Sequence, residues 1–223
     1  MTRKLRQFDL TIDLLTAALA LRHHSTAALE MRALTYIDLG RLEEAMVDLQ
    51  YAIRIDPNNA HLSVNCGSLL QQLGNVGGAL VCFKRAIQLD PSNYTAHFNA
   101  GNLYFYQRFW DKALACFDEA VRLCSNDAAI LLNRAVLRAL MADTEGSLVD
   151  FGRASALAPT SHAIYFNRAI LYESLGRPDL AEKDYSTLIQ LNVGDGQAYL
   201  QQGLLYEFVT LKAKASSETE SGS

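Results

Sequence analysis

The feature that most constrains this chain is a period of 34 residues. The segments "LLNRAVL", at residues 131–137, and "YFNRAIL", at residues 165–171, lie one period apart. Pro57 and Pro91 have the same separation, and they close the matching phrases "AIRIDPNN" and "AIQLDPSN". A fixed period of this length is the signature of a repeated supersecondary unit, so every other residue is best considered in this register.

Three positions of the period carry side chains of constant size. Positions eight and twenty are small, and position twenty-four is bulky. The first residues of the five periods are Thr26, Ala60, Tyr94, Ala128 and His162. Position eight reads Ala33, Gly67, Gly101, Ala135 and Ala169, position twenty reads Ala45, Ala79, Ala113, Ser147 and Ala181, and position twenty-four reads Leu49, Phe83, Phe117, Phe151 and Tyr185. Small residues let two helices approach closely, so the pattern predicts an antiparallel helix pair in each period.

The turn inside each pair has its own signal at position fifteen. Gly40, Gly74 and Gly176 stand there in periods one, two and five, where a left-handed residue ends a helix. Arg108 and Ala142 replace glycine in periods three and four. The position therefore predicts a tight turn between two helices, with two departures from the preferred residue.

A helix–turn–helix period with these small, aromatic and proline positions resembles the tetratricopeptide repeat family. The resemblance implies an all-α fold, in which antiparallel helix pairs stack into one right-handed superhelical solenoid of about 12 helices. The five expected repeats are residues 26–59, 60–93, 94–127, 128–161 and 162–193. Residues 1–25 are expected to form a helix in phase with the repeat, residues 194–211 a capping helix, and residues 212–223 a disordered tail.

Composition argues against several classes of protein. The net charge of −4 gives no electrostatic reason to expect nucleic acid as a partner. No run of about 18 apolar residues predicts membrane insertion, and Asp9 and Asp13 come too early for a secretory signal. The four cysteines and five histidines lack metal-ligand spacing, and no phosphate loop or nucleophile elbow occurs. We expect a cytoplasmic protein that is not an enzyme and uses no cofactor or metal.

The arginine of the "NRA" motif varies together with a residue sixteen positions later. Arginine at position seven goes with aspartate at position twenty-three in repeats one, four and five. The three pairs are Arg32 with Asp48, Arg134 with Asp150, and Arg168 with Asp184. Repeats two and three have Cys66 and Ala100 at position seven, with Cys82 and Cys116 opposite. This correlation predicts a structural ion pair within three repeats rather than a catalytic or anion-binding arginine.

The asparagine of the same motif recurs at position six. That position reads Met31, Asn65, Asn99, Asn133, Asn167 and Gln201. In the family this face of the first helix is the concave one, so the resemblance implies a row of amides along a groove. An amide can pair with the backbone of a bound peptide whatever the peptide's side chains are. The alternative is that the amides link neighbouring helices, and the two roles can coexist.

The other groove positions of the family are apolar in the C-terminal half of the groove, whereas those of the first two repeats are more polar. They include Phe98, Asn102, Phe105 and Tyr106 in repeat three, Leu132 and Val136 in repeat four, and Phe166 and Ile170 in repeat five. A contiguous apolar strip indicates an interaction surface, although superhelical curvature can bury part of it. The family's carboxylate clamps need Lys or Arg at positions two, five and six, and this sequence has neither there. We therefore expect an apolar or neutral segment rather than an acidic C-terminus.

The leading hypothesis is a non-enzymatic scaffold or adaptor that binds a partner polypeptide in this groove. Two alternatives stay open. One is the substrate-recruiting subunit of an enzyme complex, as in glycosyltransferases that carry an Asn-lined tetratricopeptide groove. The other is a structural solenoid that associates with itself through terminal half-repeats. The "NRA" motif is similar to that of tetratricopeptide proteins of cilia and flagella, so a ciliary location is the alternative to the cytoplasm.

Overall fold

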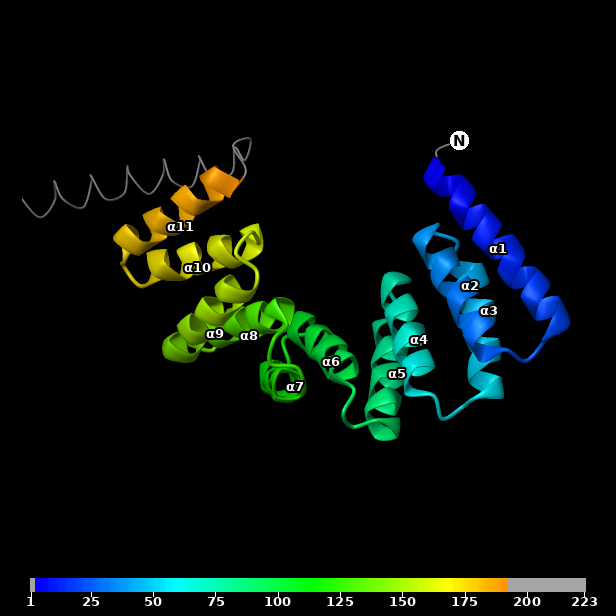
Figure 1. Ribbon diagram of the computed structural model, residues 1–223. Helices are drawn as coiled ribbons and strands as arrows, with labels where there is room; N and C mark the ends of the chain where they lie inside the picture. Colours follow the sequence, from blue (N-terminus) through cyan, green and yellow to red (C-terminus); the bar gives the residue numbers. More distant parts are fainter. Residues whose placement is uncertain (1–2, 192–223) are drawn as a thin grey trace, which may run out of the picture. The chain divides into compact units, whose positions relative to one another are not determined.

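The computed structural model describes residues 3–191 and consists, over that range, of eleven α-helices without a strand (Figure 1). The helices are α1 (Arg3–Leu21), α2 (Thr26–Asp38), α3 (Leu42–Ile55), α4 (Ala60–Gln72), α5 (Val76–Leu89), α6 (Tyr94–Tyr106), α7 (Trp110–Leu123), α8 (Ala128–Leu140), α9 (Thr144–Leu157), α10 (His162–Ser174) and α11 (Pro178–Leu191). The all-α prediction is confirmed. The expected capping helix at 194–211, the tail at 212–223 and Gln201 lie outside the described residues.

Consecutive helices pack as hairpins, one hairpin per repeat. The pairs are α2 with α3, α4 with α5, α6 with α7, α8 with α9, and α10 with α11. Their contact surfaces explain the small residues of the period. A Cβ atom added to Gly67 would lie 2.6 Å from the ring of Phe83, and one added to Gly101 would lie 2.7 Å from the ring of Phe117. Position eight is therefore small because the position-24 aromatic ring of the same hairpin rests on it.

The turn inside each hairpin is left-handed in all five repeats. Gly40, Gly74 and Gly176 have φ angles of 72°, 76° and 66°, as the sequence predicts. Arg108 and Ala142 adopt the same conformation, with φ angles of 62° and 64°. The turn geometry is thus fixed by the hairpin, and repeats three and four adopt it with a residue that does not favour it.

The chain divides into two compact units, an N-terminal unit (Met1–Ser125) and a C-terminal unit (Asn126–Ser223). In the N-terminal unit, α1 packs against α2, α3 against α4, and α5 against α6. In the C-terminal unit, α10 packs against both α8 and α9. Each unit is therefore held by contacts between neighbouring helices. No helix within residues 3–191 is long and apolar enough to cross a membrane.

Candidate functional site

Three repeats contain a bidentate ion pair between their two helices. In repeat four, the Nε and Nη2 atoms of Arg134 each donate to an Asp150 carboxylate oxygen at 2.7 Å. Asp150 is 0 % exposed, so its charge is fully removed from water. The corresponding bonds measure 2.7 and 2.7 Å for Arg32 with Asp48, and 2.8 and 2.7 Å for Arg168 with Asp184. The structure thus brings each of the three predicted pairs together inside its own hairpin.

Repeat four has an additional arginine that the sequence reasoning missed. Arg138 donates through Nη1 to Asp150 at 2.9 Å, and its Nε lies 3.5 Å from the carboxylate of Asp143. Arg138 is four residues after Arg134 and so lies on the same face of α8. That spacing is the signal that could have identified it. Two guanidinium groups, those of Arg134 and Arg138, therefore hold the buried Asp150 carboxylate. With Asp143 close to Arg138, the positive and negative charges of this cluster balance inside the repeat.

Repeats two and three replace the ion pair with thiols. Cys66 on α4 and Cys82 on α5 are free cysteines that hydrogen-bond to each other across the hairpin. That bond lowers the pKa of Cys82 to about 7, while the pKa of Cys66 is raised by the same bond and by burial. In repeat three, burial raises the pKa of the Cys116 thiol opposite Ala100. The thiols fill the space that a charged pair occupies elsewhere.

The position-six amides form short-range links in the N-terminal unit. Asn65 donates through Nδ2 to Glu30 of the preceding repeat at 2.7 Å. Asn99 lies at the limit of hydrogen bonding, with its Nδ2 3.5 Å from the hydroxyl of Ser68, also in the preceding repeat. These contacts connect α2 to α4 and α4 to α6. The helix-linking role of the amides is therefore present in this unit.

The C-terminal unit uses its amides differently. Asn167 donates through Nδ2 to the carbonyl of Ala163 in its own helix at 2.7 Å. Asn133 of α8, and Asn102 of α6 in the N-terminal unit, are also engaged in polar or other specific contacts. Among the described residues, the carbonyl Oδ1 atoms of Asn65, Asn99 and Asn167 accept no hydrogen bond. Each of these half-buried side chains thus presents an acceptor on the face of its first helix.

An apolar hollow lies beside Asn167 in the C-terminal unit. Its volume is about 420 Å³, and it is lined by Val136, Ala139, Leu140, Phe151, Asn167, Ile170, Leu171 and Ser174. Three of the predicted groove residues, Val136, Asn167 and Ile170, meet in this wall. Leu132 and Phe166 do not line it, and Phe166 instead packs edge-on against Tyr185 with 6.5 Å between ring centroids. The hollow is therefore formed by α8, α9 and α10.

The groove aromatics of the N-terminal unit are only partly available. Phe98 packs against Phe117 of the same hairpin, with ring centroids 6.0 Å apart. Phe105 and Tyr106 contact each other edge-on at 5.8 Å, and Tyr106 is 76 % exposed. Curvature is not needed to explain the burial of Phe98, because the position-24 ring of its own repeat covers it.

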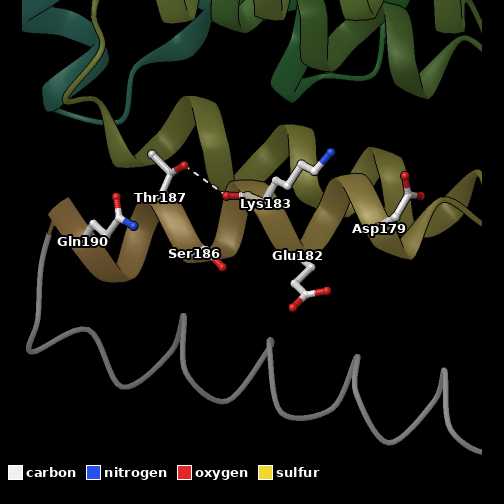
Figure 2. A pocket seen from close by; sticks show the side chains of 6 residues that line it. All are labelled: Asp179, Glu182, Lys183, Ser186, Thr187 and Gln190. Carbon is white, nitrogen blue, oxygen red and sulfur yellow. Dashed lines mark hydrogen bonds between the residues drawn. The ribbon is translucent and has the colours of Figure 1, made fainter.

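A second hollow in the C-terminal unit is lined by polar and charged residues. Figure 2 shows that the side chains around it come from one helix, α11, and Thr187 donates to the carbonyl of Lys183 at 3.0 Å. Its volume is about 460 Å³, and it is lined by Asp179, Glu182, Lys183, Ser186, Thr187 and Gln190. None of these is a predicted site residue. Over residues 3–191, no three His, Cys, Asp or Glu side chains are grouped so that they could hold a metal ion.

The sequence matches models of the tetratricopeptide repeat over much of its length. A model described as TPR repeat matches residues 33–74 and 67–108. Two models described as Tetratricopeptide repeat match residues 94–127 and 162–192. No curated protein sequence matches the chain significantly.

Solved tetratricopeptide repeat structures are similar to this fold. One, from Parabacteroides merdae ATCC 43184, is 23 % identical with a TM-score of 0.71, over 88 % of this chain and 78 % of that one. YrrB, described as a TPR protein with an unusual peptide-binding site, is 16 % identical with a TM-score of 0.68, over 85 % and 97 % of the two chains. A chain of the Cut9–Hcn1 hetero-tetramer of APC/C is 14 % identical with a TM-score of 0.77, over 90 % of this chain and 40 % of that one. At these identities the likeness shows the fold alone.

Proposed function

Because the chain belongs to the tetratricopeptide repeat family, we propose that it is a scaffold or adaptor that binds a partner polypeptide along the faces of its first helices. The fold is one that generally serves protein–protein interaction. YrrB is described as having a peptide-binding site, which supports a peptide as the kind of ligand. The specific surface is proposed from the side chains of this chain.

The observation that carries the proposal is the acceptor of Asn167 on the wall of an apolar hollow. A large aliphatic or aromatic side chain of the partner fills the space between Val136, Leu140 and Ile170. The backbone N–H beside that side chain then donates to the Asn167 carbonyl, whose own N–H₂ group is already held by Ala163. This combination of apolar walls and one fixed polar group is typical of ligand sites.

The chemistry of the partner follows from the charges at the first-helix positions. Positions two, five and six carry no Lys or Arg in any of the five repeats. The acceptors that remain on Asn99 and Asn167 are neutral and suit backbone N–H groups. The bound segment is therefore apolar or neutral, and its backbone supplies the hydrogen bonds.

The test replaces Asn99, Asn133 and Asn167 together by alanine in the full chain. Asn65 stays, because its bond to Glu30 connects two repeats. A matched control replaces three exposed second-helix amides, Gln50, Gln88 and Gln190, by alanine. Affinity capture with quantitative mass spectrometry then compares the polypeptides that each variant retains.

We expect specific polypeptides to be retained by the wild type and the glutamine control and to be depleted at least tenfold with the asparagine variant. Circular dichroism should show the same helicity for all three chains, since the replaced amides lie on helix surfaces. Equal retention by the asparagine variant would contradict the proposed surface.

A further inference from the structure

The turn between α6 and α7 combines two unfavourable features, each of which occurs singly in one other turn: Ala142 of repeat four shares the first, and Arg41 of repeat one shares the second. Arg108 occupies the left-handed position that glycine holds in repeats one, two and five. Phe109 then stands at the N-cap of α7 and makes no side-chain cap, whereas Asn75 and Asp143 cap α5 and α9 at the equivalent position. Both choices are unfavourable for the local fold. Such departures are expected to concentrate where a sequence serves function.

The side chains at this turn form an exposed aromatic patch. Phe109 is 51 % exposed and Trp110 is 36 % exposed. Tyr104 of α6 contacts the Phe109 ring edge-on, with ring centroids 6.4 Å apart. Exposed aromatic side chains of this kind are enriched in protein interfaces. We call this set, together with the cations described next, the α6–α7 turn patch.

Cations surround these rings. The ammonium of Lys112 lies 5.2 Å from the Phe109 ring centroid and 5.8 Å from that of Tyr104. Lys84 of α5 lies 6.0 Å from the Tyr104 ring, and the exposed Arg108 adds a third positive charge. Within the turn only Asp111 carries the opposite charge. The patch is thus locally basic in a chain whose net charge is −4.

Tyr104 and Phe109 stand at positions eleven and sixteen of repeat three, and other repeats pair these two positions with each other. The guanidinium of Arg41 lies 4.6 Å from the ring of Tyr36 in repeat one. Arg138 reaches Asp143 at 3.5 Å in repeat four. In repeat three the corresponding pair is Tyr104 with Phe109, so Phe109 adds exposed apolar surface beside two exposed lysines, Lys84 and Lys112. The repeats therefore act as internal references for what this turn does differently.

We propose that the α6–α7 turn patch, formed by Lys84, Tyr104, Arg108, Phe109, Trp110 and Lys112, is a second docking surface that binds an acidic segment of a partner polypeptide bearing an aromatic or large aliphatic side chain. The apolar side chain packs on Phe109 and Trp110. Carboxylates on either side of it accept charge-assisted hydrogen bonds from the two lysines and Arg108. This surface is independent of the first-helix amides and prefers the opposite chemistry, an acidic ligand rather than a neutral one.

The chain carries its own reporter for this surface, because Trp110 is the one tryptophan in its sequence. The probe is a synthetic hexapeptide in which phenylalanine and leucine are flanked on each side by two acidic residues. Its matched control replaces the four carboxylates by amides. A saturable change in Trp110 fluorescence is expected with the acidic peptide, with affinity at least tenfold above that of the amide peptide and falling as salt is raised.

Two variants locate the binding. Arg108→Gly combined with Phe109→Asn gives repeat three the turn residues of repeat two, Gly74 and Asn75. This variant should melt no lower than the wild type, yet bind a fluorescein-labelled acidic peptide at least tenfold more weakly by anisotropy. Lys112→Glu should weaken binding similarly, whereas Lys183→Glu, a charge reversal on the exposed surface of α11, should leave it within twofold.

Three outcomes would overturn the proposal. The first is equal affinity for the acidic and amide peptides, and the second is wild-type affinity in the turn variant. The third is a concentration-dependent dimer in sedimentation velocity that the turn variant converts to monomer, since a second copy would then occupy the patch. The triple asparagine variant should bind the acidic peptide normally, so failure of either proposed surface can be recognised without the other.

Discussion

At the residue scale, the two polar residues of the "NRA" motif have different surroundings. Arg134 turns into its hairpin and forms two bonds with a carboxylate that has no exposure to solvent. The adjacent position-six amide lies half-buried on the surface of the first helix. A buried charge pair adds little net stability, but removal of one partner leaves the other charge stranded. The pair therefore has to be replaced as a unit, as repeats two and three show.

The first prediction concerns this pairing in repeat one. Arg32→Ala should lower the free energy of unfolding by about 3–5 kcal/mol, because the buried Asp48 carboxylate loses its cation. Adding Asp48→Cys recreates the combination of Ala100 and Cys116 in repeat three, and should recover most of the loss. Urea denaturation followed by circular dichroism measures both. A double variant that is no more stable than Arg32→Ala would refute the ion-pair account.

At the element scale, the hairpin turn is the part in which geometry and residue preference disagree most. All five turns are left-handed, and two of them achieve this with a side chain. The cost of that conformation to a residue with a Cβ atom is about 1–2 kcal/mol. Ala142 brings only a methyl group to its turn, whereas Arg108 belongs to the turn patch proposed above. The two departures thus have different explanations, and only the second carries a functional proposal.

The second prediction tests the turn alone. Ala142→Gly should raise the free energy of unfolding by about 0.5–1 kcal/mol, because relief of the left-handed strain exceeds the added entropy of the unfolded chain. The converse change, Gly74→Ala, introduces a Cβ atom with nothing within 4 Å and should be destabilising for the backbone reason only. Urea midpoints of the two variants should move in opposite directions. If Ala142→Gly lowers the midpoint, the turn is not strained.

At the scale of the whole molecule, stability comes from contacts between neighbouring helices. Within each unit the packed elements are adjacent in sequence or one hairpin apart. A chain built in this way responds locally to damage, since each repeat contacts only the next one. Because the effect of a substitution stays local, residues of the first-helix face and residues of the α6–α7 turn patch can be replaced separately in one chain.

The third prediction uses hydrogen exchange to measure that locality. Gly67→Ala places a Cβ atom 2.6 Å from the buried Phe83 ring, and should destabilise its hairpin by about 1–3 kcal/mol. Exchange should accelerate in α4 and α5 and in the adjoining α3 and α6, but not in α10 and α11. Gly77→Ala in the same hairpin has open space around its Cβ atom and is the control, with exchange unchanged or slower. Uniform acceleration throughout the chain would contradict the locality.

The sequence register predicted the hairpins because a 34-residue period fixes which residues of one repeat face each other. It paired Arg134 with Asp150 and predicted small residues at positions eight and twenty, but it did not predict that the Phe83 ring rests on Gly67. It could not identify Glu30 as the partner of Asn65, because the offset between neighbouring repeats depends on how hairpins stack. It could not associate Lys84 with the turn of repeat three, since the contact between Lys84 and Tyr104 exists only once α5 lies beside α6.

The most direct test of the central claim is the affinity of one purified partner segment for the first-helix face. Isothermal titration calorimetry would compare the wild type, the variant with Asn99, Asn133 and Asn167 replaced by alanine, and the Gln50, Gln88 and Gln190 control. Loss of the acceptors of Asn99 and Asn167, at about 0.5–1.5 kcal/mol for each hydrogen bond, predicts a dissociation constant raised at least about fivefold in the asparagine variant. The control should stay within twofold of the wild type. A dissociation constant unchanged in the asparagine variant would contradict the account.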